Sequence, residues 1–278
     1  MGIKDKVVII TGASGGIGQA TAVAFVNAGA KVVLVARRFE VLEKLAGRLK
    51  DSIVIQADLA GEEDCRMIIE MAMSRFSHID ILINNAASII VSPSESVSRK
   101  DLLKAFSTNL LGPVSLTQEV IPYMLEQGGG HIINIGSPGF MMGIPFYSPY
   151  VCSKAALSAW TRTIQSEWEG SSIIVSEYFP GYIKTDSKPE SRLGDVEQDF
   201  LMNSKQNFIT RLFAKPGDPE VVARQLVALA LKPRILAYSD LSTRIGAFIS
   251  NISSFRLSIA AQMARTARNK KNIQTFNQ

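Results

Sequence analysis

The sequence predicts a single α/β domain built on a parallel sheet. Short β-rich runs alternate with helical patterns from residue 6 to residue 238, which is the order of repeated strand–helix–strand units. A glycine-rich turn joins the first strand to the first helix, and Asn84 and Ser137 stand at the ends of later strands. Such residues at the ends of parallel strands indicate a ligand site at one edge of the sheet.

Composition sets the limits of this prediction. The chain has 278 residues, of which 46% are hydrophobic, enough for one large domain with a sizeable core. We expect residues 1–240 to form that domain and residues 241–278 to form a C-terminal extension. The net charge is +5, but lysines and arginines mostly alternate with acids before the last few dozen residues, so we expect no nucleic-acid partner.

Cysteine and histidine are scarce. Cys65, Cys152, His78 and His131 lack the spacing of metal ligands, so the sequence predicts no metal site and a reducing compartment. Cys152 lies two residues after Tyr150 and is expected to be a small buried residue. The N-terminus has no apolar signal region, and no uncharged apolar run reaches about eighteen residues. We therefore expect a cytoplasmic protein.

The first strand is predicted at residues 6–11 and leads through the turn TGASGGIG, residues 11–18, into a helix. Glycines in this turn leave room for a pyrophosphate to approach backbone N–H groups at the positive end of the helix. The turn residues expected at the cofactor are Gly12, Ser14, Gly16, Ile17 and Gly18. A turn without a ligand is the alternative.

Two arginines follow the next strand, predicted at residues 31–36. Arg37 and Arg38 stand where a fold selective for NAD would usually have an acid that binds the ribose 2′-hydroxyl. Guanidinium groups pair well with phosphate oxygens, so the two arginines favour NADP(H) over NAD(H). A solvated loop with two surface arginines is the alternative.

Two further strands end in small or polar residues. We expect a helix at residues 39–50, a strand at 52–56, a helix at 62–76 and a strand at 80–84. Asp58 and Leu59 follow the third strand, and Asp58 either caps the next helix or contacts the adenine. Asn85 and Ala86 follow the fourth strand and suit a cofactor that passes close to the backbone.

The residues that suggest chemistry lie in the second half. Residues 98–127 are predicted to form one long helix, whose apolar stripe is interrupted by Asn109, an unfavourable residue there without a role. A strand at 131–136 ends at Ser137. The following helix begins at residue 148 or 149 and carries Tyr150 and Lys154. Because these two residues are four apart, we expect the Lys154 ammonium beside the Tyr150 hydroxyl.

The remaining elements complete the predicted domain. A strand at residues 172–179 is closed by Pro180 and Gly181, and a helix at 218–231 and a seventh strand at 234–238 follow later. The polar stretch 184–215 is either a mobile lid over a site or a plain surface excursion.

Together these motifs resemble the short-chain dehydrogenase/reductase family over roughly residues 5–238. The resemblance rests on TGASGGIG, Asp58-Leu59, Asn84-Asn85-Ala86-Ala87, Asn109, Ser137, Tyr150-x-x-x-Lys154 and Pro180-Gly181-Tyr182-Ile183-Lys184-Thr185, in the family's order and approximate spacing. Ala87 is a mild departure, because the family more often has glycine there.

The resemblance implies a single Rossmann-type, doubly wound domain with a seven-stranded parallel sheet. It also implies a homodimer or homotetramer and a match of Arg37 to NADP(H)-preferring members. The implied catalytic tetrad is Asn109, Ser137, Tyr150 and Lys154. The resemblance implies that Asp58, Leu59 and Asn85 line the adenosine side of the cofactor and that Ile183 and Thr185 meet the nicotinamide carboxamide. The other expected cofactor contacts are Ala86, Tyr150, Lys154, Pro180 and Gly181.

The residues indicate an oxidoreductase that interconverts a carbonyl and an alcohol. Tyrosine titrates near pH 10, so Tyr150 needs its ionised form favoured by about two or three pKa units, roughly 3 to 4 kcal/mol. Lys154 and an oxidised nicotinamide would favour it. In the reducing direction the cofactor gives hydride, Tyr150 gives a proton and Ser137 hydrogen-bonds the carbonyl oxygen. By resemblance, Asn109 holds a water that relays protons towards Lys154.

Other interpretations stay open at this point. A non-catalytic NADP(H)-binding sensor or scaffold, or a lyase or epimerase, would have the same fold. The apolar residues between Ser137 and Tyr150 suit a lipophilic small molecule, or they pack beneath their loop or at a subunit contact. Those residues, with one across the expected cleft, are Phe140, Met141, Met142, Ile144, Phe146, Tyr147 and Tyr182.

The C-terminal extension has an amphipathic pattern from residue 242. An apolar helical stripe runs to Met263 and is followed by Arg265, Arg268, Lys270 and Lys271. Such a stripe either packs on its own domain or a partner subunit, or makes peripheral contact with an anionic membrane surface.

Overall fold

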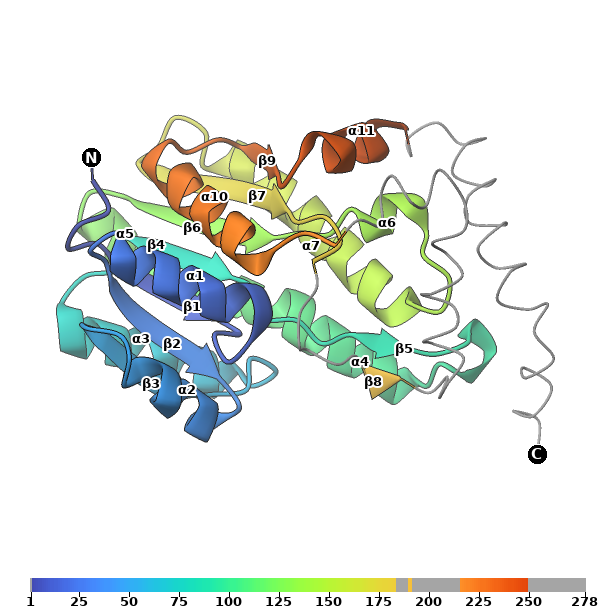
Figure 1. The fold of residues 1–278 in the computed structure, drawn as a ribbon, viewed down its shortest axis with the longest axis horizontal. Helices are drawn as coiled ribbons and strands as arrows, with labels where there is room; N and C mark the ends of the chain where they lie inside the picture. Colours follow the sequence, from blue (N-terminus) through green and yellow to red (C-terminus); the bar gives the residue numbers. More distant parts are fainter. Residues whose placement is uncertain (1, 184–189, 192–215, 250–278) are drawn as a thin grey trace.

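The computed structural model describes residues 2–183, 190–191 and 216–249. Seven parallel strands form its main sheet in the order β3-β2-β1-β4-β6-β7-β9, which confirms the predicted Rossmann-type, doubly wound fold (Figure 1). The order reverses between β1 and β4. The strands are β1 (Val7–Thr11), β2 (Lys31–Ala36), β3 (Ser52–Gln56), β4 (Ile81–Asn84), β6 (Gly130–Ile135), β7 (Ile173–Phe179) and β9 (Leu236–Tyr238).

Side chains of the central strands alternate between two buried layers. In β1, Val8 and Ile10 belong to one core, whereas Val7 and Ile9 belong to the other. A sheet that is covered on both faces needs apolar residues at every position, which explains the uninterrupted apolar runs in the sequence. Each fully buried Val or Ile side chain contributes about 1.5–3 kcal/mol to stability.

Helices cover both faces of the sheet. One face is covered by α1 (Gly16–Asn27), α2 (Phe39–Ala46) and α10 (Pro219–Leu231), and the other by α3 (Glu62–Phe76), α5 (Gly112–Glu126) and α7 (Ser148–Glu167). Figure 1 shows α10 beside α1, against which it packs. The last turn of α10 leads to β9, which pairs with β7 and forms the far edge of the sheet.

The long helix predicted at residues 98–127 is interrupted. It consists of α4 (Arg99–Phe106), a π-helical segment η2 (Ser107–Leu111) and α5. The interruption has a local cause, because the residue four positions after Asn109 is Pro113, which has no N–H to donate to the Asn109 carbonyl. The α-helical hydrogen-bond ladder therefore cannot continue unchanged past Asn109.

Other differences from the sequence prediction are small. Helix α2 ends at Ala46 rather than near residue 50, because Gly47 occupies its C-cap. Cys152 is exposed and not buried as expected, since it lies on the outer side of α7. The elements that were not predicted are η1 (Ser94–Ser96), α6 (Gly139–Met142) and a short ladder of β5 (Ile90–Val91) with β8 (Glu190–Ser191), whereas α11 (Leu241–Ile249) lies in the predicted helical C-terminal extension.

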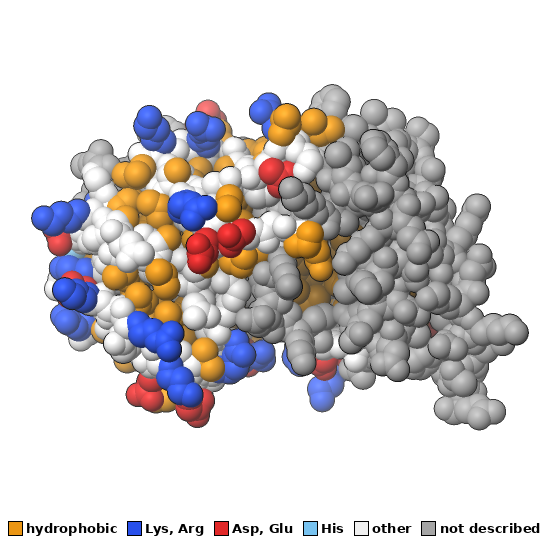
Figure 2. Space-filling view, in the orientation of Figure 1, with side chains coloured by type: hydrophobic (Ala, Val, Ile, Leu, Met, Phe, Trp, Pro, Cys, Tyr) orange, Lys and Arg blue, Asp and Glu red, His pale blue; other side chains and the backbone are white. Residues whose placement is uncertain are grey.

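Two predictions fall mostly outside the described residues. The stretch 184–215 is described only at residues 190–191, and the amphipathic tail only as far as α11, which ends at Ile249. Among the described helices, none is both long and apolar enough to cross a bilayer. On the face in Figure 2, basic and acidic side chains of the described residues are interspersed.

His131, at the start of β6, is buried in a fixed tautomer. The Ser176 hydroxyl donates to the Arg234 carbonyl at 2.6 Å, so the hydrogen between Ser176 Oγ and His131 Nε2, 2.7 Å apart, must come from the ring. Nδ1 then has no hydrogen-bond partner among the described residues. Protonating it would bury a charge, and burial accordingly lowers the pKa of His131 to about 4.

This histidine gives a testable pH dependence of stability. Its folded-state pKa is lowered from 6.5 to about 4, so the unfolded chain binds more protons between these values and stability falls as pH falls through them. We expect the wild type to lose up to about 3 kcal/mol more unfolding free energy than His131→Gln between pH 7 and pH 4. Urea titrations at both pH values measure this, and equal losses would contradict the assignment.

Candidate active site

The carboxyl ends of β1 and β4 are locked together by Thr11. Its hydroxyl accepts hydrogen bonds from the backbone N–H groups of Asn85 at 2.9 Å and Ala86 at 3.0 Å, and donates to the Ile83 carbonyl at 3.2 Å. The Asn85 side-chain amide donates to the Thr11 carbonyl at 2.8 Å. The predicted cofactor contacts Asn85 and Ala86 therefore lie at the point where the strand order reverses.

The glycine-rich turn has the backbone geometry that only glycine adopts easily. Gly12 and Gly16 have φ angles of 68° and 53°. A Cβ on Gly12 would lie 2.8 Å from the Ala86 Cα, and one on Gly18 would collide with the Gly12 carbonyl. No side chain caps α1 at Gly15, so the first N–H groups of this helix have no capping partner from a side chain. Such a helix start suits an anionic group.

The two arginines after β2 face different partners. The Arg38 guanidinium donates to the Ser14 hydroxyl at 3.1 and 3.2 Å and to the Ser14 carbonyl at 2.9 Å, which holds this cation against the glycine-rich turn. Arg37 lies 4.0 Å from the Asp58 carboxylate, and both side chains are at least half exposed. Arg38 thus stands beside the turn and Arg37 beside Asp58, while Ile17 packs against the core.

The structure excludes one of the two interpretations of Asp58, namely that it caps the following helix. Helix α3 begins after Gly61, which has no side-chain cap, and the one hydrogen bond that the Asp58 carboxylate accepts from the described residues comes from the Ala60 N–H at 3.2 Å. Asp58 therefore does not cap α3. Leu59 is buried against Gly112, where a Cβ would lie 2.7 Å from the Leu59 side chain, and its contact with the cofactor stays a prediction.

Asn109 is fully engaged through its side chain. Its Oδ1 accepts from the Ser88 N–H at 2.6 Å, and its Nδ2 donates to the Ser88 carbonyl and to the Ser153 hydroxyl, both at 2.9 Å. Ser153 in turn donates to the Tyr150 carbonyl at 2.8 Å. The buried amide thus joins η2, the segment after β4 and the start of α7. Ser88 and Ser153 were not identified from the sequence.

Ser137 and Tyr150 are brought together as predicted. Ser137 follows β6 and is almost buried, and its Oγ accepts from the Gly139 N–H at 3.2 Å. Burial raises the pKa of Tyr150 above its usual value, and a hydrogen bond with the Ser137 side chain opposes the rise. The tyrosine is therefore protonated at neutral pH in the protein as described.

Lys154 lies deeper than the sequence indicated. Its side chain is 2% exposed, and its ammonium donates to the Ile135 carbonyl at 2.7 Å, at the end of β6. Burial lowers the pKa of Lys154 to about 8, and the Glu177 carboxylate opposes this. The expected lowering of the Tyr150 pKa by Lys154 is not found, because burial of the hydroxyl dominates.

The loop after β7 is held by the segment that follows β9. The Gly181 N–H donates to the Ser239 hydroxyl at 2.8 Å, and a Cβ on Gly181 would lie 2.7 Å from the Thr243 hydroxyl. Ile183 packs on the core and forms a bridge with Gly217. Pro180 is buried, and Thr185 lies outside the described residues.

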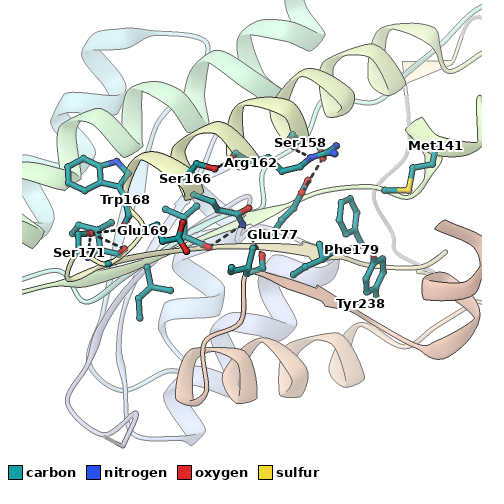
Figure 3. Close-up of a pocket in the computed structure, with 17 residues that line it drawn as sticks. Met141, Ser158, Arg162, Ser166, Trp168, Glu169, Ser171, Glu177, Phe179 and Tyr238 are labelled. Carbon is teal, nitrogen blue, oxygen red and sulfur yellow. Dashed lines mark hydrogen bonds between the residues drawn. The ribbon is translucent and has the colours of Figure 1, made fainter. Parts of the chain in front are cut away.

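A cavity of about 630 Å³ lies between α7, β7 and β9 (Figure 3). Met141 lines it, as do Phe179 and Tyr238, whose rings stack with centroids 5.4 Å apart. The ring of Phe140 lies 6.1 Å from that of Phe179, so part of the apolar loop packs inward. Tyr182 is 47% exposed. Within the described part of the chain, no cluster of three metal-ligating side chains occurs.

Glu177 is the functional candidate that the sequence analysis missed. It is a buried acid in the middle of β7 and lines the cavity. A signal was present, because a single carboxylate inside an otherwise buried strand is rare unless it is paired.

The chain belongs to the short-chain dehydrogenase/reductase family, since the family model described as "short chain dehydrogenase" matches residues 6–195. A Bacillus subtilis protein named "Uncharacterized oxidoreductase YxnA" is 38% identical over 190 residues, 66% of this chain and 53% of that protein. "11-beta-hydroxysteroid dehydrogenase A" of Sesamum indicum is 36% identical over 192 residues, 66% of this chain and 54% of that protein. The matches thus span about half the length of these two relatives.

Solved structures have the same fold. A short-chain dehydrogenase from Streptomyces avermitilis has a TM-score of 0.75 at 27% identity and covers 94% of this chain and 98% of its own. A Burkholderia phymatum structure in complex with NAD (TM-score 0.78, 20% identity, 92% and 96% covered) and a Thermococcus sibiricus structure with 5-hydroxy-NADP (0.69, 24%, 84% and 95%) share only the fold. The fold therefore does not choose between the two cofactors.

Truncation of the Asn109 side chain tests its hydrogen bonds to Ser88 and Ser153. Asn109→Ala leaves the Ser88 N–H and carbonyl without their partners, so we expect a loss of about 2–4 kcal/mol in unfolding free energy. Asn27→Ala, at an exposed position on α1, is the matched control and should change stability by less than about 0.5 kcal/mol. Urea denaturation measures both. A loss below about 1 kcal/mol for Asn109→Ala would show that the hydrogen bonds of the Asn109 side chain contribute little to stability.

Proposed function

We propose that this protein is an NADP(H)-dependent oxidoreductase that interconverts a carbonyl and an alcohol on a lipophilic small molecule. The observation that carries the proposal is that the Ser137 and Tyr150 side chains meet after β6, while the buried Lys154 ammonium is held by the Ile135 carbonyl at the end of the same strand, in a member of an oxidoreductase family. These are the groups that proton transfer to a carbonyl oxygen requires.

The chain's own residues fit a dinucleotide. Uncapped N–H groups at the start of α1 suit its pyrophosphate, and the absence of a Cβ at Gly12 and Gly16 lets a phosphate approach the turn. Thr11, Asn85 and Ala86 fix the neighbouring strand ends. When bound, NADP(H) supplies or accepts the hydride and carries a positive nicotinamide ring in its oxidised form.

Tyr150 acts as the proton donor in the reducing direction. Its raised pKa keeps the hydroxyl protonated before reaction, and the Ser137 hydroxyl hydrogen-bonds the substrate oxygen as negative charge develops there. Burial outweighs the effect of Lys154 alone on the Tyr150 pKa, so we assign stabilisation of the phenolate that remains after the proton has left to the Lys154 ammonium together with the positive ring of the oxidised cofactor. In the oxidising direction the same groups act in reverse.

Asn109 supports proton return through its backbone. Its side chain is already bound to Ser88 and Ser153, so it has no amide hydrogen left for a water. Pro113 cannot donate to the Asn109 carbonyl, and this carbonyl is the group we assign to a water that relays protons towards Lys154. The π-helical segment thereby serves the chemistry as well as the packing.

A lipophilic substrate suits the apolar residues beside the site. Phe140, Met141 and Ile144 lie in the loop between Ser137 and Tyr150, and the printed name of the Sesamum relative refers to a hydroxysteroid. The exposed Leu103 and Leu111, on α4 and η2, support assembly into a homodimer or homotetramer.

The proton-donor role is tested by Tyr150→Phe. This variant keeps the ring and its packing but lacks the proton, so we expect NADPH binding within about twofold of wild type and a loss of at least about 1,000-fold in kcat, near the upper range for acid–base catalysis. The readouts are NADPH fluorescence titration and absorbance at about 340 nm with a panel of lipophilic ketones. Tyr123→Phe removes a hydroxyl elsewhere and should retain activity. Turnover near wild type in Tyr150→Phe would refute the role.

Cofactor choice is tested at the arginines. We expect kcat/KM with NADPH to exceed that with NADH by well over tenfold, and Arg37→Ala and Arg38→Ala each to reduce this ratio by about tenfold, since one charged hydrogen bond to phosphate is worth about 1.5–3 kcal/mol. Arg48→Ala, an exposed arginine beyond α2, is the control. Equal kcat/KM for both cofactors in the wild type would overturn the preference for NADP(H).

A further inference from the structure

Glu177 is a buried carboxylate that faces α7. It lies in β7 opposite Asn134 of β6, whose amide donates to Thr161 of α7 at 2.9 Å, and residues paired in parallel strands point to the same face. The Glu177 side chain is 2% exposed. A carboxylate in such a position is costly unless charged or polar groups compensate for its lost hydration.

Three residues of α7 lie opposite this carboxylate on successive turns. They are Lys154, Ser158 and Arg162, which are four residues apart and therefore share one face of the helix. The Ser158 hydroxyl donates to Glu177 Oε2 at 3.1 Å, and the Arg162 guanidinium donates to the same hydroxyl at 3.0 Å (Figure 3). Glu177 thus faces a serine with a cation one turn to either side.

The other carboxylate oxygen is directed towards the end of β6. A Cβ on Gly136 would lie 2.9 Å from Glu177 Oε1, so the carboxylate fills the space that this glycine leaves. The preceding residue, Ile135, supplies the carbonyl that holds the Lys154 ammonium at 2.7 Å. Oε1 itself has no hydrogen-bond partner among the described residues. The carboxylate and the ammonium therefore lie at neighbouring positions along β6.

The cavity connects Glu177 with the surface. Glu177 and Ser158 are buried lining residues, while Arg162, Glu169 and Ile235, which also line it, are exposed. Its volume of about 630 Å³ is large enough for several waters. Figure 3 shows Glu177 extending towards Ser158 and Arg162 within this space.

We propose that Glu177 is a positioning residue whose carboxylate is the counter-ion that keeps Lys154 charged, and that it exchanges its proton with solvent through the cavity. The inference rests on the proposed function only in assigning a catalytic role to Lys154. It adds to that function a second group of residues, Glu177 with Ser158 and Arg162, that controls the charge of the lysine.

The charges around Glu177 agree with this role. Burial raises the pKa of Glu177 to about 7, and the Ser158 hydrogen bond, Arg162 and Lys154 oppose the rise. Burial lowers the pKa of Lys154 to about 8, and Glu177 opposes the fall. Tyr238 of β9 is also close to this carboxylate. Burial is the main cause of the raised pKa of Tyr238, and the negative charge of Glu177 raises it further. Glu169 stands at the cavity rim.

The proposal predicts a pH-dependent effect of removing the carboxylate. Glu177→Gln is isosteric and neutral, so the Lys154 pKa should fall by at least about one unit. Glu177 is itself mostly protonated below its pKa of about 7, so little should change at pH 6. At pH 8 about half of Lys154 is charged in the wild type and about one-tenth after a fall of one unit, a loss of about fivefold.

The direct test is the titration of Lys154 in protein labelled with ¹³C-lysine, without cofactor or substrate. The signal that is missing in Lys154→Met identifies the residue. We expect a midpoint near 8 in the wild type, with a smaller inflection near 7 as Glu177 titrates, and a midpoint at least about one unit lower in Glu177→Gln. Glu169→Gln removes an exposed carboxylate from the same cavity and should leave the midpoint unchanged.

The kinetic test uses the same variants with NADPH and a ketone that the wild type reduces. Glu177→Gln should have kcat within twofold of wild type at pH 6 and about fivefold lower at pH 8. A reduction by one constant factor at all pH values would indicate a structural role and overturn the proposal.

The two proposals fail in different ways. An unchanged Lys154 midpoint in Glu177→Gln, or a wild-type titration without the inflection near 7, would overturn the counter-ion role whatever the activity. The wild-type titration decides this even if the variant does not fold. Absence of turnover in the wild type with every carbonyl would instead reject the proposed function, while the NMR titration would still decide the pairing of Glu177 with Lys154.

Discussion

The burial of the Lys154 ammonium is the constraint on which the candidate site depends. A cation taken out of water costs several kcal/mol unless it is compensated, and here the compensation comes from the Ile135 carbonyl at 2.7 Å and from the Glu177 carboxylate. Both lie at the carboxyl end of the sheet, where β6 and β7 pair in register. Gly136 leaves the room that Glu177 needs, so a backbone position in one strand determines where a charge in the next can be buried.

Buried hydrogen bonds, and not apolar packing alone, hold the remaining site residues in place. Thr11 fixes the ends of β1 and β4, and Asn109 fixes η2 to the Ser88 backbone and to α7. Because these bonds involve buried groups, breaking one would leave an unpaired donor or acceptor, which costs more than the bond itself contributes. The hydrogen bonds of Asn109 therefore fix the start of α7, which carries Tyr150, and those of Thr11 fix the ends of the neighbouring strands β1 and β4.

Much of this framework was predictable from the sequence. Uninterrupted apolar runs such as Ile9–Ile10 and Val32–Val35 identify strands buried on both faces, and the family motifs give their order. Ser137 and Tyr150 were paired correctly. The depth of Lys154 was not predictable, since helical spacing gives the face of a residue but not the partner beneath it. The same limit hid Ser88 and Glu177, whose roles arise from contacts between segments far apart in the chain. The π-helical segment follows from Pro113, yet helical periodicity alone does not show it.

The central claim is that the carboxyl ends of these strands hold NADP(H) with its nicotinamide beside Tyr150. The most direct measurement is a crystal structure of the full chain grown with NADP⁺. We expect the pyrophosphate at the start of α1, the 2′-phosphate between Arg37 and Arg38, and the nicotinamide ring facing the Tyr150 hydroxyl. A dinucleotide bound elsewhere, or a ring turned away from Tyr150 while the pyrophosphate occupies the glycine-rich turn, would contradict the claim.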